Sequence, residues 1–286
     1  MRPAPAEGKV RLGSVNYLNC RPLVHDLGGA GDPDFTLRFD PPAVCASLLA
    51  SGDIDLGLIP TIAYHDRPHD CVVPGVSIAS EGAVASVALF TRRPVREIRS
   101  MALDTSSRTS VALTRILCAR RFEIAPTFAR HAPDVGAMLA AHDAALVIGD
   151  PALFVDYRAL GADKIDLGQE WTEMTGLPFV WAFWAGHADA VSPARVRRMQ
   201  RTRDFGVRAS DALADAYMTA TPERCDVARH YLRHSIAFDL DVRMLDGVRT
   251  YFREAAALGL IDHVAEPRFF PADDSAESVS DRKILS

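Results

Sequence analysis

A run of hydroxyl side chains is the first feature of this sequence that could do chemistry. Residues 105–110 read Thr-Ser-Ser-Arg-Thr-Ser and open a segment with helical periodicity. Free backbone N–H groups at a helix start, together with the positive end of the helix dipole, favour a carboxylate or a phosphate. A plain helix cap, which is the alternative interpretation, needs one hydroxyl rather than the five present here. The candidate anion-binding residues are Ser106, Ser107, Thr109 and Ser110.

Three further segments carry polar side chains that could meet a ligand. Asn16 and Asn19 flank a tyrosine in the first loop, although asparagine also serves simple turn geometry. Asp150 follows an apolar run, where either a ligand contact or a helix cap would be usual. Ser86 lies in an apolar segment, where a serine often bonds only to backbone. The candidates from these segments are Asn16, Asn19, Ser86, Gly149 and Asp150.

Strands and helices alternate along the chain in an order that brings these loops together. The order strand, polar loop, helix begins at residues 10–15 and returns near residue 103. A shift of 90 residues aligns Asn19 with Thr109 and Pro60 with Asp150. Such alternation predicts parallel sheets covered on both faces, with ligands at the carboxyl ends of the strands. The loops expected there are residues 16–19, 59–62, 106–110 and 149–152.

Two similar halves predict a two-lobed α/β fold with a ligand cleft between the lobes. Lobe 1 is expected to comprise residues 1–90 and 186–286, and lobe 2 residues 91–185. The apolar segments 84–90 and 179–185 are the expected crossing strands.

The C-terminal part of the sequence predicts helices that pack back on lobe 1. Helical periodicity covers residues 196–219, 222–235 and 242–258. A run of arginines over 195–208 is expected to form a solvated helix face. The last dozen or so residues are rich in Ser and Asp and are expected to be loose.

Composition excludes several classes of protein. The 286 residues are 48% hydrophobic and 24% charged, with a net charge of −5, which gives no global attraction to nucleic acid or anionic membrane. No apolar stretch reaches the roughly 18 residues of a membrane span. Residues 1–10 lack the apolar core of a secretory signal, and the five cysteines show no C-x-x-C spacing. We therefore expect a cytoplasmic protein with free thiols and with no nucleic-acid or membrane partner; oligomeric partners stay open.

Familiar catalytic and metal-binding motifs are missing from the sequence. There is no Walker A loop, G-x-S-x-G elbow or H-E-x-x-H motif. His65 and His69 are four apart, but Pro68 breaks the helix that a metal site with this spacing needs. Cys20 has no histidine nearby in sequence to activate it as a nucleophile. Three tryptophans could line a site for a ring-shaped ligand, although an apolar aromatic strand more often belongs to a core: Trp171, Trp181 and Trp184.

Several separated motifs together resemble one family. They are residues 13–23 (GSVNYLNCRPL), 104–111 (DTSSRTSV), 147–150 (VIGD) and 171–179 (WTEMTGLPF), with residues 80–87 fitting as well. In this order they resemble the chorismate dehydratase family of the futalosine route to menaquinone. The resemblance implies a type II periplasmic-binding-protein fold that is used in the cytoplasm as an enzyme. It also implies a lyase that removes water from chorismate to give 3-[(1-carboxyvinyl)oxy]benzoate, with no metal and no cofactor.

The resemblance also implies roles for particular residues. The hydroxyl run would bind a carboxylate of chorismate, Asn19 would correspond to a family active-site asparagine, and Ser86 would add a hydrogen bond from the crossing strand. The proton would be taken by the substrate's own enolpyruvyl carboxylate, with Asp150 as a possible protein base.

Other functions remain open on the sequence alone. The main alternative is a non-catalytic cytoplasmic protein that binds a small aromatic or cyclic carboxylate. A transporter's binding protein would need a signal, and a regulator would need a helix-turn-helix segment before the first strand. The related dihydroxynaphthoate-forming family carries a Cys-Pro-Asn-Asp type of first loop, whereas this chain has Asn-Tyr-Leu-Asn-Cys.

Overall fold

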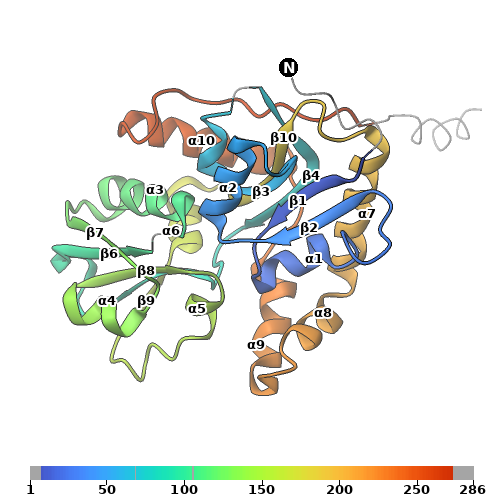
Figure 1. Cartoon of the computed structure of the whole chain (residues 1–286). Helices are drawn as coiled ribbons and strands as arrows, with labels where there is room; N and C mark the ends of the chain where they lie inside the picture. Colours follow the sequence, from blue (N-terminus) through green and yellow to red (C-terminus); the bar gives the residue numbers. More distant parts are fainter. Residues whose placement is uncertain (1–7, 68, 105, 273–286) are drawn as a thin grey trace, which may run out of the picture.

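The computed structural model describes residues 8–67, 69–104 and 106–272, which form two five-stranded sheets side by side (Figure 1). In spatial order, the first sheet contains β2 (Phe35–Phe39), β1 (Val10–Ser14), β3 (Leu56–Pro60), β10 (Phe179–His187) and β4 (Asp70–Ser80). The second contains β7 (Thr127–His131), β6 (Ser100–Asp104), β8 (Ala144–Ile148), β5 (Val87–Thr91) and β9 (Asp163–Asp166). The two-lobed α/β architecture expected from the alternation of elements is present.

Both sheets are mixed, so the expectation of parallel sheets is only partly right. Strands β1, β2 and β3 are parallel, as are β6, β7 and β8. By contrast, β10 is antiparallel to β3 and β4, and β5 is antiparallel to β8 and β9. The reason is the point of entry: Val87 pairs with Ile148, the last residue of β8, and Ala182 pairs with Pro60, the last residue of β3. Each crossing strand therefore enters its sheet at the carboxyl ends of the parallel strands and must run back against them.

The crossings lie earlier in the chain than the expected lobe limits. A limit at residue 90 cuts β5, which belongs to the second sheet, and a limit at residue 185 cuts β10, which belongs to the first. The chain passes between the sheets at residues 81–86 and 176–178, between β4 and β5 and just before β10.

Helices cover the sheets, and local sequence signals set many of their ends. Gly52 closes one helix in the left-handed conformation, at φ +75°, as expected of a C-terminal glycine. Ser107, Asp134, Asp166 and Ser192 each cap a helix start through a side-chain oxygen. The helices are α1 (Arg21–Val24), α2 (Pro42–Ser51), α3 (Arg108–Leu117), α4 (Val135–Ala141), α5 (Gly149–Phe154), α6 (Leu167–Thr175), α7 (Pro193–Arg208), α8 (Ser210–Tyr217), α9 (Cys225–His230) and α10 (Val242–Ala257).

Short 3₁₀ and π-helical segments interrupt this pattern. The expected helix over 196–219 is broken at Ala209, where the Ser210 hydroxyl bonds back to the carbonyl of Val207 (2.7 Å). The 3₁₀ segments are η1 (Leu18–Cys20), η2 (Thr61–Tyr64), η3 (Val95–Glu97) and η5 (Pro222–Arg224), and the π-helical ones are η4 (Cys118–Phe122) and η6 (Tyr231–Ser235).

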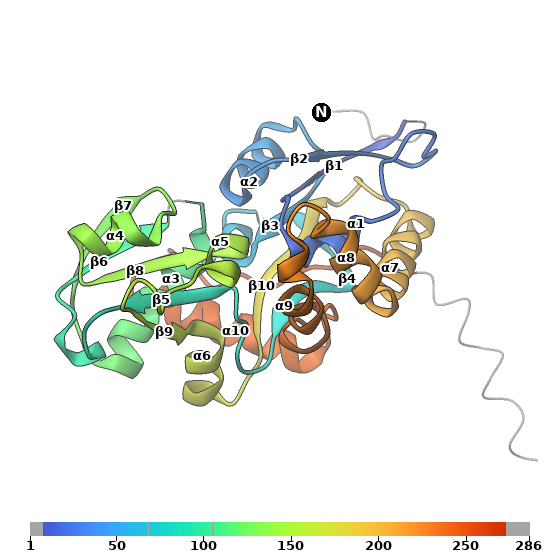
Figure 2. The ribbon, with the colours of Figure 1, turned by 90° about the horizontal axis from the view of Figure 1, so that it is seen from below.

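The C-terminal helices pack on the first sheet, and α10 also reaches the second half of the structure. Helix α7 packs against α1 and β4, whereas α10 packs against both β10 and α3, below the junction of the sheets in Figure 2. The arginines of α7 are not simply a solvated face, because Arg198 pairs with the buried Asp32 (2.9 Å) and Arg195 with Asp34 (3.4 Å). These ion pairs anchor α7 to the first sheet.

Some expectations fall on residues that the structure does not describe. The loose C-terminal tail lies largely beyond residue 272, and Thr105 of the hydroxyl run and Pro68 are also outside the described residues. Within the described part, the model contains no helix of the length and apolarity that crossing a bilayer requires. All five cysteines are described and carry free thiols, as expected.

Candidate active site

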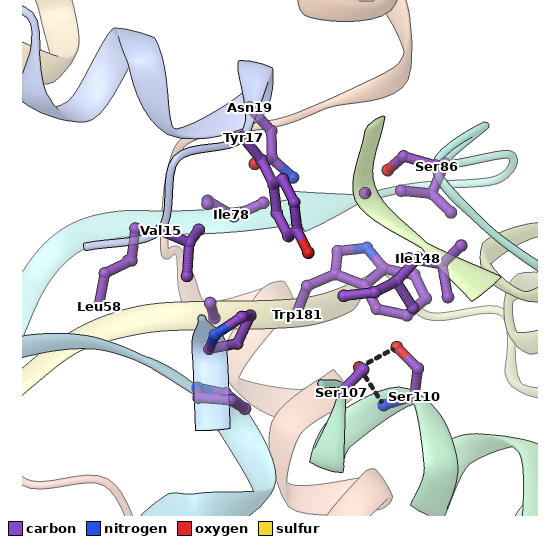
Figure 3. Close-up of a pocket in the computed structure, with 16 residues that line it drawn as sticks. Val15, Tyr17, Asn19, Leu58, Ile78, Ser86, Ser107, Ser110, Ile148 and Trp181 are labelled. Carbon is purple, nitrogen blue, oxygen red and sulfur yellow. Dashed lines mark hydrogen bonds between the residues drawn. The ribbon is translucent and has the colours of Figure 1, made fainter. Parts of the chain in front are cut away.

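A pocket lies where the carboxyl ends of the parallel strands of both sheets face each other (Figure 3). It encloses about 580 Å³ of empty space, its open mouth included. Apolar side chains make much of its wall, with Val15, Leu58 and Ile78 from the first sheet and Ile148 from the second. A ligand here would therefore be desolvated on several sides, which strengthens each polar contact that it makes.

The first loop contributes Tyr17 and Asn19 to the pocket but directs Asn16 away from it. Asn19 lies in η1, and its Oδ1 accepts a hydrogen bond from the thiol of Cys20 (3.4 Å). Burial raises the pKa of that thiol to about 12, so Cys20 is a neutral donor and not a thiolate nucleophile. Asn16 is exposed, and its side chain accepts a hydrogen bond from Arg21. The expectation that Asn16 contacts the ligand is not met by this geometry.

The hydroxyl run reaches the pocket through two of its members. Ser107 caps α3 by accepting a hydrogen bond from the backbone N–H of Ser110 (3.2 Å). The Ser107 hydroxyl donates to the hydroxyl oxygen of Ser110 (2.7 Å), and both residues line the pocket. Both side chains lie across the pocket from Tyr17 in Figure 3. Together with the start of α3, they offer donors to a negatively charged group.

Ser106 and Thr109 brace the loop instead of lining the pocket. The Ser106 hydroxyl and N–H both donate to the buried carboxylate of Asp104 (2.6 and 2.8 Å). Thr109 Oγ1 accepts a hydrogen bond from the backbone N–H of Ile62 (3.2 Å), which belongs to the other half of the chain. Neither Ser106 nor Thr109 lines the pocket, although Ser106 also interacts with the Tyr17 hydroxyl, so their contacts with a ligand stay a prediction.

Ser86 and Gly149 meet where the chain first crosses between the sheets, at residues 81–86. Ser86 is 1% exposed and lies just before β5, not within the crossing strand as expected. Its carbonyl accepts a hydrogen bond from the N–H of Gly149 (2.7 Å). Gly149 has φ +65°, and a Cβ there would come within 2.8–3.0 Å of the Tyr17 ring, so glycine lets the two loops touch.

The loop that carries Ser86 is held in a strained shape. Ala85 has φ +63°, a left-handed conformation that a residue with a Cβ adopts at a cost. The carboxylate of Asp166 accepts hydrogen bonds from the N–H groups of Val84 (2.9 Å) and Ala85 (2.6 Å). The ammonium of Lys164 donates to the Ala85 carbonyl (2.5 Å), and burial lowers its pKa. Charged side chains on both sides thus fix the backbone that positions Ser86.

Replacing Ala85 by glycine should stabilise the protein. Relief of left-handed strain should raise the free energy of unfolding by about 1–2 kcal/mol, and the greater entropy of glycine in the unfolded chain should lower it by about 0.4–1 kcal/mol. We expect the free energy of unfolding to rise by about 0.5–1 kcal/mol in urea titrations. Ala85→Val is the opposite case, because a β-branched residue tolerates this φ less well and should destabilise. A glycine variant that is less stable than the wild type would show that the conformation is not strained.

Asp150 joins the two halves of the chain and does not line the pocket. Its Oδ1 accepts a hydrogen bond from the backbone N–H of Leu18 (3.2 Å), and its Oδ2 lies 2.5 Å from the hydroxyl of Tyr217. That hydroxyl is also 2.9 Å from the carbonyl of Asn16, yet it has only one hydrogen. A protonated Asp150 would supply the second hydrogen. Burial raises the pKa of Asp150, and this outweighs the opposing hydrogen bonds and the charges of Arg21 and Arg224.

Stability should therefore fall as the pH rises through the raised pKa of Asp150. Between its ordinary pKa of about 3.9 and its raised value, the native protein binds more protons than the unfolded chain. Asp150→Asn keeps one acceptor and one donor but cannot titrate, so it should remove the pH dependence that Asp150 gives to the free energy of unfolding. The variant should therefore gain stability relative to the wild type as the pH rises. Thermal unfolding from pH 4 to 8 measures the difference, with the exposed Asp156→Asn as the control. An unchanged pH profile in Asp150→Asn would contradict the assignment.

Three aromatic residues lie at or near the pocket; the sequence patterns did not single out Tyr17 and Tyr231 as ligand contacts, and they offered Trp181 only as one of three tryptophans that could line a site. Tyr17 reaches into the pocket from between the two asparagines, and its pKa is raised, mainly by burial. Trp181 on β10 lines the pocket and donates to the hydroxyl of Ser80 (3.1 Å), whereas the other two tryptophans are fully buried in the core. Tyr231 lies behind Ser86, in a C-terminal segment that carried only a helical pattern.

Comparison with solved structures defines the class of protein. A protein from Archaeoglobus fulgidus has a TM-score of 0.70 at 14% identity and covers 90% of this chain and 100% of its own. The alkanesulfonate-binding protein of Xanthomonas axonopodis pv. citri, solved with bound MOPS, has a TM-score of 0.68 at 17% identity and covers 91% and 96%. At these identities the likeness is one of fold. The chain therefore has the periplasmic-binding-protein-like fold, as expected.

Sequence comparison identifies the family. The model of a family described as menaquinone biosynthesis matches residues 10–257. The curated chorismate dehydratase of Thermus thermophilus is 30% identical over 278 residues, which are 91% of this chain and 98% of that protein. This chain belongs to the menaquinone-biosynthesis family that includes chorismate dehydratase, so the resemblance found in the sequence motifs is confirmed.

Proposed function

We propose that the protein is a chorismate dehydratase, a lyase that works in the pocket between the two sheets. The observation that carries this proposal is the convergence of separate segments of the chain on one desolvated space, whose polar side chains include Tyr17, Asn19, Ser86, Ser107 and Ser110. Chorismate is a cyclohexadiene with two carboxylates. The start of α3 with its two serines suits one carboxylate, and Tyr17 and Trp181 suit the ring.

The reaction removes a proton from C3 and the hydroxyl from C4 of chorismate. One water leaves, and the ring becomes the benzoate of 3-[(1-carboxyvinyl)oxy]benzoate, so aromaticity supplies the driving force. Among the described residues, the pocket wall carries no Asp, Glu, His, Lys or Arg side chain. This favours proton removal by the enolpyruvyl carboxylate of the substrate itself. The protein then contributes orientation, preorganised donors and exclusion of water.

The lobes of this proposal follow the sheets. One lobe is built on the first sheet with the C-terminal helices, and the other on the second sheet. The crossings at residues 81–86 and 176–178 would serve as the hinge, so that the bound substrate is enclosed when the lobes approach each other.

A direct assay tests the proposal. Purified protein is mixed with chorismate, with no metal or cofactor added, and products are followed by mass spectrometry. Loss of one water, with the diene absorbance replaced by a benzoate spectrum, is the expected result. Unchanged chorismate that still raises the melting temperature would favour a binding protein, a function that the sulfonate-binding structures of the same fold make a real second candidate. If chorismate were neither turned over nor able to raise the melting temperature, both functions would be refuted for this ligand.

A further inference from the structure

A buried tyrosine hydroxyl joins the two candidate catalytic residues from behind. The hydroxyl of Tyr231 lies 2.7 Å from the hydroxyl of Ser86, and it also interacts with the side chain of Asn19. Tyr231 is 2% exposed and does not line the pocket. It comes from η6, 145 residues beyond Ser86, and so connects the C-terminal region to both loops.

The hydrogens available in this cluster can be assigned by counting donors and acceptors. Burial raises the pKa of Tyr231, so its hydroxyl keeps its one hydrogen at neutral pH. The Oδ1 of Asn19 already faces the Cys20 thiol, which leaves the amide N–H group of Asn19 to face Tyr231. If Tyr231 accepts from Asn19, its own hydrogen goes to Ser86. The hydrogen of Ser86 then has no acceptor in this cluster and is free for a ligand.

We infer that Tyr231 is a positioning residue that fixes Ser86 as a hydrogen-bond donor into the pocket. In this chain of hydrogen bonds, Asn19 donates to Tyr231 and Tyr231 donates to Ser86. Ser86 in turn donates to an oxygen of the substrate. This inference rests on the proposed function, because the acceptor is taken to be an oxygen of chorismate. Each bond in the chain polarises the next, so the Ser86 hydroxyl is both oriented and strengthened as a donor. Tyr231 acts only through Ser86 and Asn19 and never touches the substrate.

Neutron diffraction of the unliganded protein tests the direction without any assay. Deuterium on the Tyr231 oxygen should point to Ser86, and deuterium on Ser86 should point into the pocket. Deuterium on Ser86 aimed at Tyr231 would overturn the inference. This measurement decides the matter even if the protein does not turn over chorismate, a result that would refute only the proposed function.

Kinetics test the consequence once the wild type is shown to turn over chorismate. Tyr231→Phe should lower kcat about 10-fold with little change in KM. Ser86→Ala should lower kcat about 100-fold. Adding Tyr231→Phe to Ser86→Ala should lower kcat by less than about twofold more, because a residue that acts through another has no effect once that other residue is gone.

Tyr64→Phe is the matched control for burial. Tyr64 is 1% exposed, and its hydroxyl also has two partners, the carbonyl of Asp70 (2.9 Å) and the N–H of Arg268 (3.0 Å), away from the pocket. The Tyr64→Phe variant should leave kcat unchanged while lowering the free energy of unfolding at least as much as Tyr231→Phe does. Wild-type kcat in Tyr231→Phe, equal losses in both variants, or additive losses with Ser86→Ala would each overturn the inference.

Discussion

Replacing Asn19 by alanine is expected to lower kcat for chorismate about 100- to 1,000-fold, the usual effect of removing one preorganised donor beside a reacting group. Stability should change far less than activity, because the side chain is only partly buried and its contacts are one with the Cys20 thiol, a weak donor, and one with the Tyr231 hydroxyl. A loss of about 1 kcal/mol would move the melting temperature by about 2–4 °C. Steady-state kinetics and thermal unfolding of the same sample measure both.

Asn16→Ala is the control for this experiment. Asn16 lies three residues earlier in the same loop, but it is exposed, and its side chain contacts Arg21 instead of the pocket. Its removal should change kcat by less than about threefold. Near-normal turnover in Asn19→Ala, or an equal loss in both variants, would contradict the role assigned to Asn19.

Gly149→Ala should reduce kcat/KM about 100-fold. The new methyl group would lie 2.8–3.0 Å from three ring atoms of Tyr17, so the ring and the first loop must move away from the second sheet. A displacement of about 1 Å at a reacting centre can cost about 100-fold in rate. The positive φ of 65° adds about 1–2 kcal/mol of strain to the folded state.

Gly161→Ala separates the strain from the clash. Gly161 has φ +62°, and a Cβ there meets no atom within 4 Å. This variant should lose a similar free energy of unfolding in urea while keeping wild-type kcat/KM. If Gly149→Ala kept full activity as well, the contact between Tyr17 and Gly149 would not matter for substrate binding.

Local sequence signals predicted much of the fold and missed what depends on distant partners. The strands at 10–15 and 179–185, and the helix that Gly52 ends, follow from apolar runs and from a C-terminal glycine. The antiparallel direction of β5 and β10 depends on where the chain enters each sheet, which no short pattern encodes.

The candidate site shows the same division between local and distant information. The loops predicted from the sequence reach the pocket, but neighbouring residues within each loop face different ways. Ser107 and Ser110 face the pocket, whereas Ser106 turns to Asp104 and Thr109 turns to Ile62. Asp104 lies two residues from Ser106, and Ile62 lies 47 residues from Thr109. Only the folded chain therefore distinguishes the residues that face the pocket from those that do not. Tyr231 escaped notice because its helical neighbours gave it no distinguishing pattern.

The placement of the tryptophans makes the protein its own optical reporter. The pocket wall includes Trp181, while Trp171 and Trp184 are 0% exposed in the core. A ligand that displaces water from the Trp181 indole would change its fluorescence, above the background of the two core residues. Ligand binding can therefore be followed in stopped-flow experiments on the unlabelled protein, separately from the appearance of product.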